Sequence, residues 1–338
     1  MNKRTLRADI LLVLTAAIWG FGFVAQRSGM EYIGPFAFNG IRFILGSLFL
    51  FPFIFVRRKN RSGSFKNLLP PALLAGSCLF IAVLFQQIGI LFTTAGNAGF
   101  ITSLYVVFTP LFGIFLGRKT GFPTWIGSVL TLVGLYFLSV AGRPSVNPGD
   151  IIIFISAFLW TAHVLLIDRL MHSDIQRDVS IDPLELSAGQ FAVCGILMMF
   201  GAFLAEPHVI PVIENIDPAL LLTGLFEWQP FPALVWALKA GTMQVSMDAL
   251  IPILYGGFCS VGIAYTLQVV AQRDAPPAHA TIILCFEGCF AAFGGVLLLS
   301  EKIGAWTLLG FLLMLAGMLA TQWGAHKSAV SLGKEGNA

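Results

Sequence analysis

Charge is scarce in this sequence. Asp, Glu, Lys and Arg make up only 11% of its 338 residues, whereas hydrophobic residues make up 57%, and the mean hydropathy is +0.84. Soluble domains usually carry about 25% charged and about 45–50% apolar residues. This balance excludes an ordinary soluble protein and predicts a polytopic membrane protein.

The recognisable motifs of enzymes are also absent. The sequence has no Walker loop, no GxSxG, no HExxH, and no pair of acidic residues at metal-ligand spacing near a membrane surface. Its five cysteines fall within apolar stretches, which favours packing over a disulfide framework. We therefore expect no cofactor and no metal. Any uphill transport by this chain would have to use an ion gradient or exchange.

What the sequence does contain is a series of apolar stretches. A transmembrane helix needs about 20 mostly apolar residues, and lipid cannot satisfy the bare backbone of an open strand. The predicted spans are 9–27, 35–56, 69–92, 95–117, 123–141, 150–168, 184–205, 249–271, 277–299 and 304–323. They predict an all-α membrane protein with ten transmembrane helices.

The distribution of positive charge predicts the orientation. Most of the twenty Lys and Arg residues lie in the N-terminal segment, in the C-terminal segment or in the connections expected on the same side of the membrane. Cytoplasmic segments are enriched in these residues. We therefore expect a multi-pass protein of the cell (inner, cytoplasmic) membrane with both termini in the cytoplasm.

The chain also repeats itself. Asp9, Ala16 and Trp19 recur 141 positions later as Asp150, Ala157 and Trp160, and a second register recurs after 182 positions. The pairs in the second register are Ile81/Ile263, Ala82/Ala264, Gln86/Gln268, Ala98/Ala280, Ile101/Ile283, Phe108/Phe290, Gly113/Gly295 and Leu116/Leu298. Since each unit holds an odd number of spans, the second copy must enter the membrane from the opposite side. The sequence predicts two inverted five-helix repeats.

The predicted repeats are residues 1–143 and 144–325. The shift between equivalent residues of the two repeats grows from 141 to 182 positions along the chain, which indicates an insertion at 206–248. We expect this insertion on the outer side, lying on the membrane. Two interpretations of this insertion stay open, a lid over the outer mouth or a tolerated loop insertion. Residues 326–338 are expected to form a disordered cytoplasmic tail.

Several stretches resemble the EamA family of the drug/metabolite transporter superfamily. They are AAIWGFGFVAQR (16–27), echoed by SAFLWTAHVLLIDR (156–169), and AGNAGFITSLYVVFTPLFGIFLGRK (95–119), echoed by PPAHATIILCFEGCFAAFGGVLLLSEK (276–302). The resemblance implies ten helices in two inverted halves and a central cavity lined mainly by helices 1, 3, 4, 6, 8 and 9. It also implies transport, often export, of small metabolites such as amino acids or related compounds.

Glu287 is the acidic residue that sits deep in a predicted span. An ionised carboxylate there costs about 3 kcal/mol on insertion scales, so it must be partnered, protonated or exposed to a water-filled cavity. It is a candidate proton-coupling carboxylate or a partner for a cationic substrate group. The alternative is a protonated carboxyl bonded to a neighbouring helix. Its repeat equivalent is Tyr105, so charge chemistry would differ between the halves.

Other candidates for the substrate pathway are polar or aromatic. Gln86 and Gln268 have matched depths, and either bond between helices or contact the substrate. Trp19 and Trp160 either gate the cavity, stack on a substrate ring or pack in the core. The remaining candidates are Asn97 and His279 at helix starts and His163 within a helix, each with a structural role as the alternative. Arg42, the basic residue within a span, either extends outward to the interface or pairs with a carboxylate, and a structural role is favoured.

These features favour a secondary active transporter that exports small metabolites by alternating access. Its expected partners are a small-molecule substrate, membrane lipid and, as a candidate coupling ion, the proton. Nucleic acid is not an expected partner, and monomer and homodimer both stay open. A passive facilitator of the same fold is the alternative. A multispanning membrane enzyme is less favoured, because the five His residues are scattered along the chain.

Overall fold

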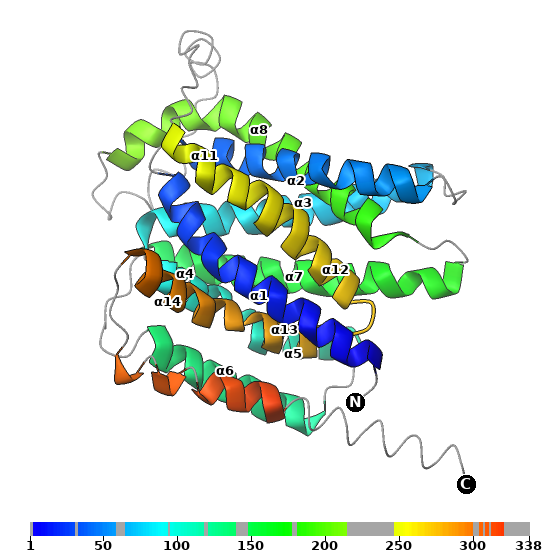
Figure 1. The fold of residues 1–338 in the computed structure, drawn as a ribbon, viewed down its shortest axis with the longest axis vertical. Coiled ribbons are helices and arrows are strands. Elements are labelled where there is room, and N and C mark those ends of the chain that lie inside the picture. Colours follow the sequence, from blue (N-terminus) through cyan, green and yellow to red (C-terminus); the bar gives the residue numbers. More distant parts are fainter. Residues whose placement is uncertain are drawn as a thin grey trace.

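The structure is a computed structural model in which every described element is a helix (Figure 1). It describes residues 3–30, 33–58, 65–93, 95–117, 121–139, 148–177, 181–214, 247–299, 304–306, 308–310 and 312–320. Of the predicted insertion, residues 206–214 continue a helix, and 215–246 lie outside the described residues, as does the predicted tail 326–338. The two interpretations of the insertion therefore stay predictions.

The helices follow the predicted spans. In the first half they are α1 (Lys3–Gly29), α2 (Pro35–Arg58), α3 (Phe65–Phe92), α4 (Ala95–Thr102), α5 (Tyr105–Phe115) and α6 (Phe122–Ser139). In the second half they are α7 (Pro148–Arg177), α8 (Pro183–Glu214), α11 (Met247–Leu254), the π-helix η1 (Tyr255–Tyr265), α12 (Thr266–Ala271), α13 (Pro277–Leu284) and α14 (Phe286–Leu299). Residues 312–320 are also helical.

Length and composition agree with a multi-pass membrane protein. Among the described residues, six helices are long and apolar enough to cross a membrane: Lys3–Gly29, Pro35–Arg57, Asn67–Phe92, Pro148–His172, Pro183–Leu204 and Leu250–Ala271. Shorter apolar helices occupy Tyr105–Phe115, Phe122–Phe137, Pro277–Ala291 and Leu308–Ala320. The all-α prediction is confirmed for the described residues, and helices fall in each of the ten predicted stretches.

Helix ends follow local chemistry more than hydropathy. Proline is the first residue of α2, α7, α8 and α13, where its fixed φ and missing N–H carry no penalty. Gly117, with φ of 75°, follows the end of α5 in the left-handed conformation typical of helix C-termini. At the predicted span 150–168, α7 extends past the apolar residues and continues through polar residues to Arg177.

Two predicted spans are interrupted at equivalent positions. The helix 4 stretch is divided between α4 and α5 at Ser103 and Leu104, and the helix 9 stretch between α13 and α14 at Cys285. Near both interruptions a backbone N–H bonds to the carbonyl three residues earlier, as in Leu104 N to Ile101 O (3.1 Å) and Gly288 N to Cys285 O (3.1 Å). Such tightened turns inside helices often mark functional hinges.

The arrangement places α1 at the centre of the fold. It lies between the α11–η1–α12 segment and the α13–α14 segment and contacts all of these helices (Figure 1). At the bottom of the same view, α6 packs against the helical residues 312–320. A Cβ on Gly134 would lie 2.6 Å from Gly310 O, and one on Gly317 would lie 2.7 Å from Gly127 O. These glycines therefore allow close approach of the two helices.

A comparable close approach joins α1 to α14, and it makes a testable prediction. A Cβ on Gly20 would meet Phe290 Cβ and would lie 2.7 Å from Glu287 O. We expect Gly20→Ala to lower stability by about 1–3 kcal/mol through overpacking, measured as the thermal midpoint of the purified protein in detergent. Gly121→Ala is the matched control, because its Cβ would lie 3.6 Å from the nearest atom, Pro123 Cδ. Equal midpoints for the two variants would contradict the α1–α14 packing.

Candidate transport site

A small polar cavity lies where the two interrupted spans meet α1, α2, α3 and α7. Its volume is about 30 Å³, which is space for about two water molecules. We call it the central cavity. It is lined by Trp19, Phe23, Gln26, Arg42, Gln86, Thr102, Tyr105, Trp160, Val164, Ser260, Tyr265, Gln268, Leu284 and Glu287. Six of the candidate residues from the sequence are among these: Trp19, Gln86, Tyr105, Trp160, Gln268 and Glu287.

Glu287 and Tyr105 form the contact between the two interruptions. Tyr105 is the first residue of α5, Glu287 lies in the first turn of α14, and the Tyr105 hydroxyl donates to Glu287 Oε1 at 3.0 Å. Nearby, Cys285 Sγ donates to Ser103 O at 3.3 Å. Glu287 is only 4% exposed.

The two candidate glutamines have different surroundings. Gln86 Nε2 donates to Thr102 Oγ1 at 3.1 Å, so this amide ties α3 to α4. Gln268 is as deeply buried, but its Oε1 has no hydrogen-bond partner among the described residues. An unpaired buried acceptor at a cavity wall is a place for water or a ligand. Gln268 is thus the better placed of the two to contact a substrate.

Arg42, for which the sequence favoured a structural role, lines the central cavity with Glu287. It is 2% exposed, so it does not extend out of the span. Its Nε donates to Asn39 Oδ1 at 2.8 Å, and its Nη2 lies 3.4 Å from Gln26 Oε1. The guanidinium also lies over the rings of Phe38 and Phe43, 5.5 and 5.1 Å from their centroids. Arg42 makes no ion pair with any described carboxylate. Its position within a span was the available signal, since intramembrane charges are by default functional candidates.

Aromatic rings close one side of the central cavity. Tyr265 packs edge-on against Trp19, with ring centroids 4.5 Å apart, and is stacked with Trp160 at 6.0 Å. Trp19 Nε1 donates to Ser260 O at 3.2 Å. This bond fixes Trp19 to the π-helix η1, and π-helical segments occur frequently at functional sites. Both tryptophans therefore line the cavity and pack against a neighbouring ring.

The two candidate histidines lie outside the central cavity. His163 is fully buried one turn from Trp160, and its Nε2 lies 3.0 Å from Gln190 Oε1. His279 Nε2 donates to Asp9 Oδ1 at 2.7 Å and so joins α13 to the N-terminal part of α1. Asn97 belongs to α4, but its side chain lies outside the described part of the chain.

A second, larger crevice lies at the ends of several helices. Its volume is about 840 Å³, and we call it the arginine crevice. Its charged and titratable lining residues are Arg4, Arg7, Arg57, His172, Asp182, Arg273 and Asp274. Thr266 and Leu267 of α12 line it as well, and Tyr265 and Gln268 beside them line the central cavity. The two spaces therefore lie within one helical turn of each other along this span.

Apolar helices long enough to cross a membrane surround a cavity lined by polar side chains, an arrangement typical of membrane transport proteins. The profile of the EamA-like transporter family matches residues 6–140 and 231–322. This chain belongs to that family, which confirms the resemblance seen in the sequence. It is similar to an uncharacterized transporter of Archaeoglobus fulgidus, with 28% identity over 94% of this chain and 87% of the relative.

Two further matches agree with this membership. The uncharacterized inner membrane transporter YedA of Escherichia coli is 26% identical over 60% of this chain and 73% of its own length. A solved crystal structure superposes with a TM-score of 0.67 at 15% identity, covering 94% of this chain and 98% of that one. This second likeness concerns the fold alone. Both curated relatives described above are named transporters, which agrees with the expectation of a non-enzyme.

Proposed function

We propose that this protein is a secondary active transporter that exports a small zwitterionic metabolite, such as an amino acid, in exchange for protons. The observation that carries the proposal is that Arg42 and Glu287 line the same cavity without pairing with each other. A buried charge is costly unless it is partnered. A substrate with one carboxylate and one ammonium group would partner both side chains at once.

Exchange with protons follows from competition at Glu287. One carboxylate binds either a proton or the substrate ammonium group, so each cycle that carries substrate outward leaves the site free to take up a proton from outside. The proton gradient across the inner membrane then drives export. This mechanism needs no ATP-binding module, in keeping with the motifs the sequence lacks.

Contacts between the halves support an inverted repeat with alternating access. Tyr105 and Glu287 are separated by 182 residues, as are Ser103 and Cys285, which is the shift of the repeat. Pairs of equivalent residues meet in this way only near a pseudo-twofold axis, where inverted-repeat transporters have their sites. The small cavity admits water but no metabolite, so substrate binding must separate the helices around it.

The two ends of the pathway are closed by different polar contacts. At one end, His279 bonds to Asp9. At the other end, Arg27 Nη1 donates to Thr93 O at 3.0 Å, and Thr93 Oγ1 donates to Asp150 Oδ1 at 2.6 Å. The arginine crevice lies at the end of the first contact, so the positive-inside bias supports placing that end in the cytoplasm. Alternate breaking of these contacts would open one side at a time.

Counterflow in proteoliposomes tests the proposed function. Purified protein would be reconstituted, loaded with an unlabelled compound and supplied with the same compound in labelled form. We expect labelled zwitterionic amino acids to enter, and we expect much weaker signals for the matching amines, which lack the carboxylate, and for the N-acetylated acids, which lack the ammonium group. Equal signals for all three forms would contradict the zwitterion site. Counterflow without accumulation under a pH gradient would identify a passive facilitator.

A further inference from the structure

Asp168 is one of three buried carboxyl groups in the described part of the second half, with Asp150 and Glu287. Its side chain is 0% exposed, and it lies on α7 between two groups of lining residues. Trp160 and Val164 line the central cavity, and Met171 and His172 line the arginine crevice. At about 1.5 Å of rise per residue, Val164 and Met171 are about 10 Å apart along the helix. Asp168 therefore lies in the layer that separates the two spaces.

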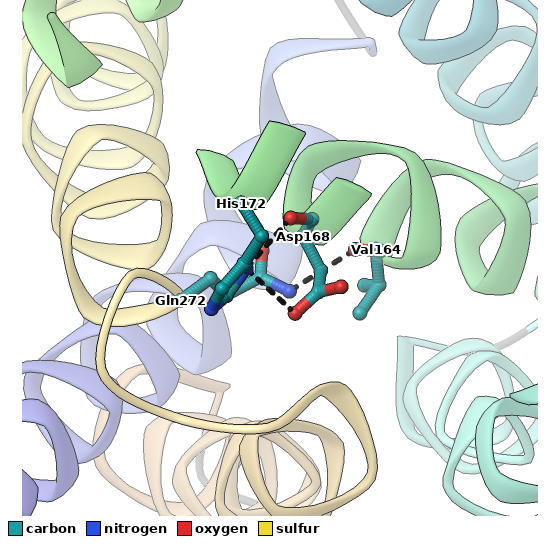
Figure 2. A network of polar contacts seen from close by, with 4 residues as sticks. All are labelled: Val164, Asp168, His172 and Gln272. Atoms are coloured by element: carbon teal, nitrogen blue, oxygen red, sulfur yellow. Dashed lines mark hydrogen bonds and ion pairs between the residues drawn. The ribbon is translucent and has the colours of Figure 1, made fainter. Parts of the chain in front are cut away.

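His172 connects this carboxyl group to the crevice. Its side chain is 45% exposed, and its Nδ1 lies 3.3 Å from Asp168 Oδ1. The same nitrogen donates to the Asp168 carbonyl oxygen at 2.8 Å (Figure 2). These contacts fix the imidazole over the carboxyl group. A buried acid is thus in contact with a ring that water in the crevice reaches.

Two amides extend the polar path toward the central cavity. The Gln272 side chain reaches from the end of α12 to α7, where its Nε2 donates to Val164 O at 3.1 Å beside Asp168 (Figure 2). Gln268 precedes it by one turn and lines the central cavity with Glu287. The Oε1 atoms of both glutamines are buried and have no hydrogen-bond partner among the described residues. Buried acceptors of this kind are places for ordered water.

We propose that Asp168 is a proton-transfer residue that links Glu287 to the arginine crevice through water held by Gln268 and Gln272, with His172 as its positioning residue. In this step the Glu287 carboxylic acid gives a proton to a bridging water, which passes one to the Asp168 carboxylate. Asp168 then releases a proton to water in the crevice. Each carboxyl group gains and loses one proton, and no other bond changes. The inference rests on the proposed proton exchange.

Other charged groups line the crevice onto which His172 opens. They are Arg4 and Arg7 of α1, Arg57 of α2, Asp182 before α8, and Arg273 and Asp274 after α12. These groups line the crevice, whereas Asp168 is buried behind His172. Substitution of an exposed crevice carboxylate is therefore a control for general effects of charge on the pH profile.

The test compares Asp168→Asn with Asp274→Asn, which removes an exposed carboxylate from the same crevice. We expect Asp168→Asn to slow pH-gradient-driven substrate accumulation and substrate-driven proton release by about 100-fold or more, the lower range for a positioned proton-transfer group. Counterflow of labelled substrate should stay within about twofold of the wild type, because substrate sites are not touched. Asp168→Glu should restore part of the proton flux, and Asp274→Asn should leave both activities unchanged.

The outcomes separate this inference from the proposed function. If the wild type shows no counterflow, the proposed function fails. If the wild type couples transport to protons and Asp168→Asn does so with an unchanged rate and pH profile, the transfer route is wrong. Should Asp168→Asn not fold, His172→Gln tests the same route at a half-exposed position. That variant should shift the pH profile of proton release and leave counterflow intact, and an unshifted profile would overturn the proposal.

Discussion

Glu287→Gln is expected to abolish accumulation of substrate under a pH gradient. Glutamine keeps the size of the side chain and accepts the hydrogen bond from Tyr105, but it cannot exchange a proton. The ammonium group of the substrate would also lose its carboxylate partner. We expect the half-saturation concentration in counterflow to rise about 30-fold, equivalent to about 2 kcal/mol. Proteoliposome assays between pH 5 and 9 would measure both effects, and the remaining counterflow should be independent of pH.

Tyr105→Phe is the matched control for that substitution. It removes the hydroxyl that bonds to Glu287 and leaves the carboxyl group in place. Coupling should persist with a displaced pH profile, because loss of one hydrogen bond changes an equilibrium by about 1 kcal/mol. Gradient-driven transport by Glu287→Gln with the wild-type pH profile would show that the carboxyl group only ties α14 to α5.

Arg42→Met is expected to remove selectivity for the substrate carboxylate. Methionine is apolar and flexible enough to fill part of the space, but it leaves the carboxylate without a charged partner. Loss of a buried charged hydrogen bond costs about 3 kcal/mol, so the affinity for a zwitterion should fall about 100-fold. The affinity for the matching amine should change little. Fluorescence of Trp19 and Trp160, which line the cavity, would report both titrations.

Stability provides the control for Arg42. Arg42→Met leaves Asn39 Oδ1 and Gln26 Oε1 without their donor, so we expect the protein to stay folded with a stability lower by about 1–3 kcal/mol, measured as the thermal midpoint. Arg42→Lys should recover only part of the affinity, because an ammonium group lacks the planar, bidentate geometry of the guanidinium. Wild-type affinity for zwitterions in Arg42→Met would mean that Arg42 only holds Asn39 and Gln26 in place.

Much of the fold was predictable because hydropathy is a local property. A chain with so little charge must place its apolar runs in lipid as helices, since the backbone bonds have to be satisfied within each segment. The repeat shift of 182 residues makes Tyr105 and Glu287 equivalent positions in the sequence, and these two residues are hydrogen-bonded in the structure. Buried carboxylates in apolar runs are costly enough to be noticed, which is why Glu287 was a candidate.

Other features depended on what surrounds each helix. Gln86 and Gln268 have equal depth in the sequence pattern, but only Gln86 has Thr102 within bonding distance. Asp168 follows the last apolar residue of its run, so hydropathy placed it at a membrane surface, whereas in the structure its side chain is fully buried and in contact with His172.

The sequence by itself determined the membrane class, the helical content and the family. Only the tertiary structure decided that Arg42 faces the same cavity as Glu287, because the rotation of a helix about its axis is set by packing against its neighbours. An apolar span has little amphipathic signal to fix that rotation.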